Sequence, residues 1–345
     1  MNHSESAGWK IPWKGIIFGL IAAVLALVLV FTQIAHPRDI WEELQDYPTE
    51  YFVAALLCLA ASWAVDGVRM RVLTKGTGEP VPWWEMTLTL IASNFITLVT
   101  PFAGGGGPYI AYTLYRRGRS GAHAMAIVLL GGFAAQTGLA ILAFTVLSVM
   151  GEIPLDVASA VKYVRWGFAA YFAILVILTI LVWQGKRIQR LFVRWEVAQN
   201  WLDEFNHYYR ELFIPRGRYY IQTLLAGLAY FALNYAAGFM ILSGFGVANG
   251  LKRYGVSVLL GVAPIISPIP GGAGAAELVA YHMLDEALPV DALGTFIVLW
   301  RTVLFYIPIL VGGTLLAYQV MRYAAEPRVR PAEAVILPDE NDHNK

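Results

Sequence analysis

Long apolar runs alternate with short polar segments along this chain. A helix that crosses a bilayer core of about 30 Å needs about 20 residues. Six runs approach or exceed this length, at residues 15–35, 51–68, 122–150, 166–183, 219–245 and 293–320. The run at 15–35 exceeds the core of a signal peptide, which is about 7–15 residues, and we interpret it as a retained first span. The pattern predicts an all-α integral membrane protein with about six full transmembrane helices in a membrane domain at residues 15–322.

Two further apolar regions, at about 84–115 and 254–286, are interrupted near the middle by proline and glycine. The first interruption reads TPFAGGGGP at residues 100–108, and the second reads SPIPGGAG at residues 267–274. Proline removes a backbone donor and glycine is a poor helix former, so neither stretch supports a continuous helix. Each region predicts a re-entrant helical hairpin.

The distribution of basic residues predicts the orientation, because lysine and arginine are enriched in cytoplasmic loops. With residues 1–14 in the cytoplasm, six spans and two re-entrant hairpins, most of the 25 basic residues lie inside. The outside segments then hold only Arg38, Lys162, Arg165, Lys252 and Arg253. A single crossing by one broken region would place the basic loop at 184–218 outside. The charges therefore favour re-entrant hairpins and cytoplasmic termini.

The two interruptions align at one offset of 167 residues. The matched positions are Thr100-Pro101 with Ser267-Pro268, Gly104-Gly105 with Gly271-Gly272, and Gly107 with Gly274. The first hairpin enters from the inside and the second from the outside, so the alignment predicts an inverted repeat, although matches in Gly/Pro-rich stretches also arise by chance. Broken helices that meet near the midplane of inverted repeats are the usual architecture of a transport site.

Three polar segments flank the spans. Residues 36–50 combine acidic residues with Trp41 and Tyr47, which is typical of an interfacial helix on the outer side. Residues 186–212 interleave arginine with large apolar residues and predict an amphipathic helix, either on the anionic inner leaflet or packed on the bundle. Residues 323–345 are predicted to be a disordered cytoplasmic tail.

Composition agrees with a membrane protein and narrows the chemistry. Of the 345 residues, 58% are hydrophobic and 14% are charged, against about 25% charged in soluble domains. The single cysteine, Cys58, excludes an intrachain disulfide and a cysteine-based metal site. The six histidines have no ligand spacing. We therefore predict no metal, no cofactor and no nucleic-acid partner.

Enzyme signatures are missing from the sequence. The glycine run at 104–107 lacks the Lys-Ser/Thr of a P-loop, and Tyr109 stands where a dinucleotide fingerprint needs glycine. There is no G-x-S-x-G elbow and no H-E-x-x-H motif. These absences favour a transporter over an enzyme, although an enzyme acting on a lipid-linked substrate stays open.

The glycine clusters are the first candidate binding elements. A half-helix is expected to begin after each cluster, at about Pro108 and about Ala275, with free N–H groups and a positive dipole end. Two such ends facing each other would bind a phosphate; the alternative is that the glycines serve only tight packing and chain reversal. The candidate residues are Pro101, Gly104, Gly105, Gly106 and Gly107 in the first cluster, and Pro270, Gly271, Gly272 and Gly274 in the second.

Two intramembrane charges are the second candidate. Glu277 follows the second glycine cluster and Arg301 lies inside the last span, and charges at membrane depth are functional candidates by default. Glu277 could instead cap its own helix. Arg301 could neutralise Glu277, bind a lipid phosphate, or serve as structural glue.

Other polar residues are weaker candidates. Asn94, Gln136, Asn234 and His282 interrupt apolar runs, where interhelical hydrogen bonding is the commoner role. Arg116 and Arg117 could collect anionic head groups, although positive-inside anchoring alone explains them.

These motifs resemble the lysylphosphatidylglycerol synthase transmembrane family, the flippase-like module of the multiple peptide resistance factor proteins. The likeness rests on Pro268 to Glu277 with Arg301, Pro308 and Gly312, and on Asn94 to Pro101 with Gly104 to Pro108 and the run Tyr112-x-x-x-Arg116-Arg117-Gly118. It covers about residues 50–322. The resemblance implies a helical fold with re-entrant elements that moves phospholipid between leaflets. Many members have a polar or acidic residue after the first glycine pair, where this chain has Gly107-Pro108-Tyr109-Ile110. We expect no aminoacyltransferase domain after the last span.

Several functions remain open at this point. The leading hypothesis is a flippase in a bacterial or archaeal cell membrane, with a phospholipid partner whose head group is anionic or aminoacylated, and with a homo-oligomer possible. The alternatives are a secondary transporter of a small solute and an accessory subunit of an envelope-lipid assembly pathway.

Overall fold

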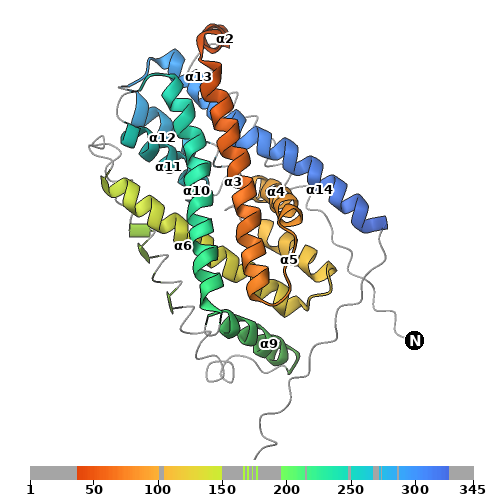
Figure 1. The fold of residues 1–345 in the computed structure, drawn as a ribbon. Helices are drawn as coiled ribbons and strands as arrows, with labels where there is room; N and C mark the ends of the chain where they lie inside the picture. Colours follow the sequence, from red (N-terminus) through yellow and green to blue (C-terminus); the bar gives the residue numbers. More distant parts are fainter. Residues whose placement is uncertain are drawn as a thin grey trace, which may run out of the picture.

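The apolar runs of the sequence fold into long helices (Figure 1). The computed structural model describes residues 37–100, 105–149, 196–213, 216–247, 250–266, 272, 274–285 and 287–325, with a few single residues between 166 and 177. Every regular element within these ranges is a helix. In chain order the helices are α2 (Pro37–Asp46), α3 (Thr49–Gly76), α4 (Trp83–Val99), α5 (Gly106–Arg116), α6 (Gly121–Val149), α9 (Glu196–Phe213), α10 (Gly217–Gly244), α11 (Gly250–Ile266), α12 (Ala275–Leu284), α13 (Val290–Arg301), the π-helix η4 (Thr302–Tyr306) and α14 (Ile307–Ala325).

Four helices in the described part are long and apolar enough to cross a membrane. They are α3, α6, α10 and the continuous helix from Val290 to Tyr323 that α13, η4 and α14 form together. They match the apolar runs at 51–68, 122–150, 219–245 and 293–320. The expected spans at 15–35 and 166–183 lie outside the described residues, apart from single residues of the second.

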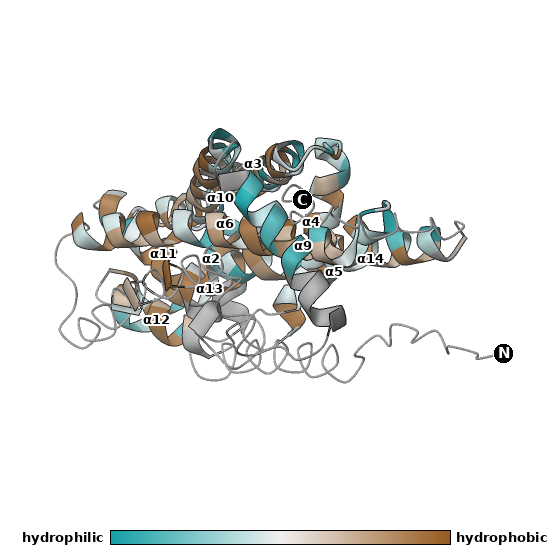
Figure 2. Cartoon of the chain, turned by 90° about the horizontal axis from the view of Figure 1, so that it is seen from below, coloured by the Kyte–Doolittle hydropathy of each residue, from teal (hydrophilic) through white to brown (hydrophobic). Residues whose placement is uncertain are grey.

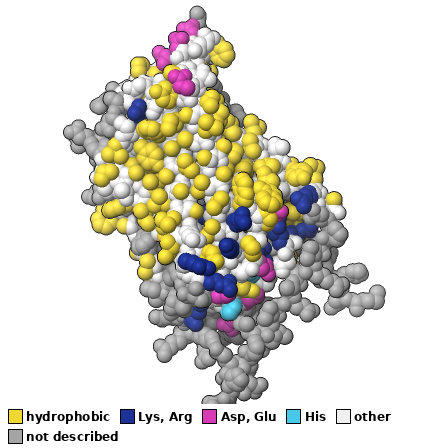
Figure 3. Space-filling view, in the orientation of Figure 1, with side chains coloured by type: hydrophobic (Ala, Val, Ile, Leu, Met, Phe, Trp, Pro, Cys, Tyr) yellow, Lys and Arg dark blue, Asp and Glu magenta, His cyan; other side chains and the backbone are white. Residues whose placement is uncertain are grey.

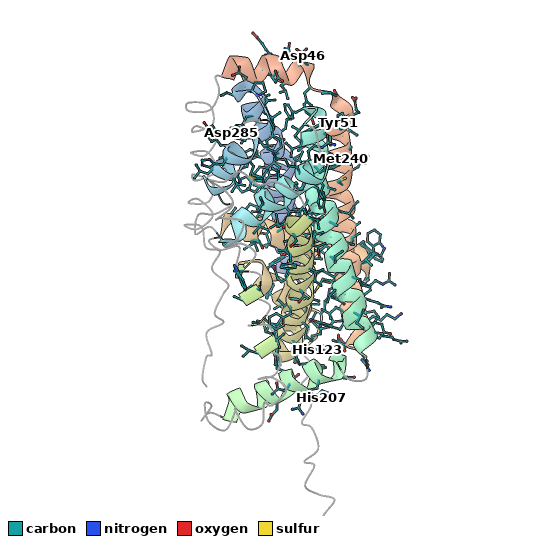
Figure 4. The ribbon with its side chains drawn as sticks, turned by 90° about the vertical axis from the view of Figure 1, so that its left-hand side faces the viewer. Asp46, Tyr51, His123, His207, Met240 and Asp285 are labelled. Carbon is teal, nitrogen blue, oxygen red and sulfur yellow. The ribbon has the colours of Figure 1, made fainter. Side chains whose placement is uncertain are left out.

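The bundle has two chemically different ends, which we call the α2 end and the α9 end. Asp46 and Asp285 lie toward the α2 end, and His123 and His207 toward the α9 end (Figure 4). Figure 3 shows a broad hydrophobic surface between them, with acidic side chains near the α2 end, and with most lysine and arginine and further acidic side chains near the α9 end. A belt of this kind, with charge confined to its two edges, suits a bilayer core bounded by polar interfaces.

Helices α3 and α10 lie side by side and run in opposite directions (Figure 1). At the α2 end, the Tyr47 hydroxyl donates a hydrogen bond of 2.9 Å to the carbonyl of Ile241. Burial raises the pKa of the Tyr47 phenol, so the hydroxyl remains a donor at neutral pH. At the opposite end, Arg216 Nη1 donates to the carbonyl of Gly76 at 2.7 Å. These two bonds fasten the start of each helix to the end of the other.

The two broken apolar regions form two pairs of short helices, α4 with α5 and α11 with α12. The outer ends of the first pair meet, because Arg117, after α5, forms an ion pair with Glu85 in the first turn of α4. The second pair lies between the end of α10 and the start of α13, both at the α2 end. The expected bounds of 84–115 and 254–286 compare with 83–116 and 250–284 in the structure.

The offset of 167 residues found in the glycine clusters also relates whole helices. Shifting α3 by 167 gives 216–243, against 217–244 for α10, and shifting α4 gives 250–266, which are the bounds of α11. A shifted α5 covers 273–283, where α12 spans 275–284, and a shifted α6 begins at 288, close to the start of α13 at 290. Four successive helices thus recur at one spacing.

Small residues permit close approach where α6 crosses α10. A Cβ built on Gly138 would lie 2.7 Å from the backbone nitrogen of Leu228, and one built on Gly227 would lie 2.8 Å from the Cα of Ala135. Transmembrane helices commonly use small residues in this way, because apolar lipid provides no hydrophobic force to join helices and van der Waals packing must do so.

The polar segments are partly described. Helix α2 falls in the segment expected to be interfacial, and α9 covers the second half of the expected amphipathic segment; residues 186–195 lie outside the described range. Phe205 and Tyr209 of α9 are buried against α6 and its neighbours, and its hydrophilic residues show in Figure 2. The described part of α9 therefore packs on the helix bundle. Helix α14 continues to Ala325, so residues 323–325 are helical, and residues 326–345 lie outside the described range.

Candidate functional site

Glu277 lies in the first turn of α12, directly after the second glycine cluster. Gly272 and Gly274 have φ angles of 65° and 83°, a region in which residues with a Cβ are strained. The backbone N–H of Gly274 donates to Glu277 Oε2 at 2.9 Å. The glycines therefore turn the chain sharply into α12, and the carboxylate folds back over the start of its own helix.

Arg301 is the last residue of α13 and points at the same carboxylate. Its Nε lies 2.8 Å from Glu277 Oε1, and its Nη2 lies 2.8 Å from Oε2 and 2.7 Å from Oε1. Nη2 also donates to the carbonyl of Gly272 at 3.3 Å. A guanidinium that meets both oxygens of one carboxylate makes the strongest and most directional kind of ion pair in proteins. We call Gly272, Gly274, Glu277 and Arg301 the Glu277 site.

Aromatic side chains enclose this pair. The Arg301 guanidinium carbon lies 5.0 Å from the ring centroid of Trp300 and 5.3 Å from that of Phe305. Arg301 is 5% exposed and Glu277 is 8% exposed. The Trp300 indole N–H is buried and has no acceptor among the described residues. Helix η4 begins directly after Arg301, and π-helical turns inside α-helices are frequently found at functional sites.

The electrostatics of the Glu277 site are those of a closed, neutral pair. A carboxylate near a helix N-terminus is stabilised by the helix dipole and by the free N–H groups of the first turn, and here the guanidinium balances its charge. Such a pair offers a buried cation and a buried anion to any ligand that can open it. No group of three His, Cys, Asp or Glu side chains in the described ranges is placed to hold a metal ion.

The structure changes the picture of a phosphate site at facing helix ends. The start of α12 is already covered by the Glu277 carboxylate, so capping and pairing with Arg301 occur together. An anion could bind this helix end only by displacing Glu277, because two negative charges would otherwise compete for one set of donors. The second glycine cluster is therefore better described as a support for Glu277 than as a bare anion cradle.

The first glycine cluster serves a different purpose. A Cβ on Gly106 would lie 2.3 Å from Thr97 Oγ1, so this glycine lets α5 pack closely on α4. The N–H of Gly105 donates to Thr100 Oγ1 at 3.0 Å. A Cβ on Gly107 would make only an ordinary van der Waals contact, 3.4 Å from Val128 Cγ1. Gly106 therefore serves close helix packing, which was the alternative to phosphate binding for these glycines.

Several predicted site residues lie elsewhere or outside the described part. Asn94 is half-buried on α4 and makes no side-chain hydrogen bond to another described residue. Pro101, Gly104, Pro270 and Gly271 lie outside the described residues.

The two arginines at the end of α5 are not part of the Glu277 site. Arg116 Nη2 donates to the carbonyl of Tyr323 at 3.0 Å, and Arg117 pairs with Glu85. Tyr323 lies 22 residues beyond Arg301 on one continuous helix, which corresponds to roughly 30 Å at 1.5 Å per residue. Arg116 therefore lies near the α9 end, far from Glu277.

Sequence reasoning missed a second buried ion pair. Arg69 Nε lies 2.6 Å from Asp66 Oδ1, and Arg69 Nη1 donates to the carbonyl of Gly131 at 2.7 Å. Arg69 is 6% exposed. A usable signal was present, since Asp66 is an isolated acidic residue inside an apolar run and an arginine follows three positions later on the same helical face. We treat this pair as a link between α3 and α6.

The long apolar helices, the hydrophobic belt and the buried charges define a helical, multi-pass membrane protein. Comparison with known proteins gives the particular family. Residues 16–312 match the family described as the lysylphosphatidylglycerol synthase TM region, and the chain belongs to this family. It is also similar to a UPF0104 membrane protein of Archaeoglobus fulgidus, with 19% identity over 338 residues, covering 89% of this chain and 97% of the relative. The resemblance found in the glycine motifs and in Glu277 and Arg301 is thereby confirmed.

Proposed function

We propose that this protein moves phospholipid between the leaflets of a prokaryotic cell membrane, with anionic or aminoacylated head groups as its substrates. The observation that carries the proposal is the buried, bidentate pair of Glu277 and Arg301 at the break between α11 and α12. Buried charges in membrane proteins usually mark a substrate or ion path. The family is named after a lysylated phospholipid, which favours a lipid over a small solute.

The architecture we propose is an inverted repeat. The common offset of 167 residues and the opposite directions of α3 and α10 support it. In this arrangement α4 and α5 form a re-entrant hairpin that enters from the α9 end, and α11 and α12 form one that enters from the α2 end. With the runs at 15–35 and 166–183 as further spans, the domain has six full crossings.

The orientation we propose places the α9 end in the cytoplasm. Most lysine and arginine side chains of the described part gather near that end (Figure 3), and cytoplasmic loops are enriched in basic residues. Both termini are then cytoplasmic.

Transport in this proposal depends on an exchange of partners at the Glu277 site. An unpaired charge left in a buried site costs about 3–5 kcal/mol, so the pair stays closed without a ligand. A lysylated head group carries both a phosphate and an amine. Its phosphate takes Arg301 and its amine takes Glu277, so each buried charge keeps a partner while the pair opens. A neutral solute has no charges that could replace Glu277 and Arg301 as each other's partners. We propose no catalytic step.

The test is head-group translocation in proteoliposomes. The purified full-length protein is reconstituted with fluorescent lipids that carry neutral, anionic or lysyl head groups, and a membrane-impermeant quencher reports exchange between leaflets. We expect exchange above that of empty liposomes, fastest for the lysyl lipid. Glu277→Gln should slow it at least about tenfold, since about 1.4 kcal/mol in the barrier is sufficient for that change.

Asp66→Asn is the matched control. Both variants remove the acid of a buried arginine pair with similar side-chain exposure, 8% and 14% for Arg69 and Asp66 against 5% and 10% for Arg301 and Glu277. Asp66→Asn should keep most of the exchange. Equal loss in both variants would assign the effect to folding, and folded protein that moves none of the lipids would contradict the proposal.

A further inference from the structure

The surface of α3 near the α9 end is hollowed in two adjoining places. One hollow has a volume of about 550 Å³ and lies between the end of α3 and the start of α10. The other, of about 500 Å³, extends along α3 beside the start of α4. Lys75 lines both, and we call the two hollows together the Lys75 groove. The residues that the argument uses are Arg71, Lys75, Arg216, Arg218, Val68 and Trp83.

The polar half of the Lys75 groove carries an excess of positive charge. Arg71 and Lys75 are exposed, and neither side chain has a partner among the described residues. Arg218 lies with its guanidinium carbon 4.8 Å from the ring centroid of Tyr219. Arg216 alone has an acidic partner, Glu211, at 2.9 Å. No described carboxylate lines either hollow.

The other half of the groove is apolar. Ala64, Val68 and Val72 line it together with Trp83. The three aliphatic residues recur every fourth position, so they form a stripe along one face of α3 that is about 12 Å long. Trp83 is 41% exposed, and tryptophan is enriched at the interface between membrane and water. The stripe therefore leads from the interface toward the membrane interior, while the cations remain at head-group depth.

We propose that the Lys75 groove binds one anionic phospholipid of the leaflet at the α9 end. Its phosphate lies among Arg71, Lys75, Arg216 and Arg218, and one acyl chain follows the stripe of Ala64, Val68 and Val72. A soluble phosphate would use the cations alone, whereas a lipid uses both halves of the groove. Basic pockets between transmembrane helices are a known way to hold anionic head groups. This site is separate from the Glu277 site and does not depend on transport.

The experiment measures lipid binding to the delipidated full-length protein in dilute detergent micelles. Fluorescence anisotropy follows acyl-labelled phosphatidylglycerol and acyl-labelled phosphatidylcholine. Phosphatidylglycerol should bind at least about tenfold more tightly. Arg71→Gln and Lys75→Gln should each weaken its binding about fivefold, and the double variant about 25-fold, from the usual contribution of one basic residue to the binding of anionic lipid.

Two controls keep the effect specific. Arg117→Gln removes a basic residue at the same end, outside the groove, and should leave phosphatidylglycerol binding within about twofold of the unchanged protein. Lys75→Arg keeps the positive charge and should retain most of the phosphatidylglycerol binding. The exposed positions of Arg71 and Lys75 leave folding intact, which an unchanged melting temperature verifies.

Three results would overturn the proposal. They are equal binding of the two lipids, unchanged binding in the double variant, and displacement of phosphatidylglycerol by millimolar inorganic phosphate, which would assign the groove to a soluble anion. Glu277→Gln should leave this binding unchanged, so a failure of the transport proposal and a failure of the groove proposal give different results.

Discussion

Removing the charges of the Glu277 site one at a time and then together gives a direct measure of the pair. The variants are Glu277→Gln, Arg301→Gln and the double variant. Glutamine has the size of glutamate and a polar amide, and in place of arginine it removes the charge together with part of the side chain and most of its donors. Each single variant leaves one ion without its partner, whereas the double variant leaves none.

The magnitude follows from the geometry of the site. The three contacts between Arg301 and Glu277 measure 2.7 to 2.8 Å, and the two residues are only 5% and 8% exposed. Breaking a buried pair of this kind costs about 3–5 kcal/mol in the free energy of unfolding. The double variant carries no isolated charge, so its loss should fall short of the summed single losses by about 2–3 kcal/mol.

The assay is detergent-induced unfolding in mixed micelles, followed by tryptophan fluorescence. Glu85 and Arg117 provide a matched reference pair at the surface, with side chains 30% and 38% exposed. Exposed pairs contribute about 1 kcal/mol or less, so the same cycle at this pair should give a small coupling. A coupling at Glu277 and Arg301 no larger than at the surface pair would refute the view of a desolvated, mutually dependent pair.

Two other predictions concern packing and topology. Gly138→Val should lower the free energy of unfolding by about 1–3 kcal/mol, because its Cβ would lie 2.7 Å from the Leu228 nitrogen. Gly132→Ala should have little effect in the same unfolding assay, because a Cβ at this position would have no other atom within 4 Å. The topology is tested with single cysteines in a Cys58→Ser background. A cysteine at position 80 or 117 should react with an impermeant maleimide from one side of the membrane, and one at exposed position 287 from the other side. Reaction of all three from one side would contradict the inverted hairpins.

The helices were the most predictable part of the structure. Each apolar run inside the described ranges forms a helix, and both glycine-proline stretches fall where helices end, between Val99 and Gly106 and between Ile266 and Ala275. Hydrophobic length and helix-breaking residues are local properties, so the sequence is sufficient to read them. The structure adds that the offset found in a few glycines extends over four helices.

The roles of individual polar residues were less predictable, because they depend on contacts between distant segments. Glu277 and Arg301 were expected to be candidates, but only their placement in space selects pairing among the options. The spacing of Asp66 and Arg69 was a readable signal for their pairing, but Gly131, whose carbonyl accepts a further hydrogen bond from Arg69, is 62 residues away in the sequence. Positive φ angles explain Gly272 and Gly274, and close packing explains Gly106; a run of glycine letters reveals neither role.

The two halves of the fold are alike in helices and different in chemistry, and this difference bears on mechanism. At the offset of 167, Glu277 corresponds to Ile110 and Arg301 corresponds to Ala134, so the first half has no equivalent ion pair. Its glycines pack α5 on α4, whereas those of the second half position a carboxylate. A transporter built on a symmetric scaffold needs only one set of buried charges if both access states share it.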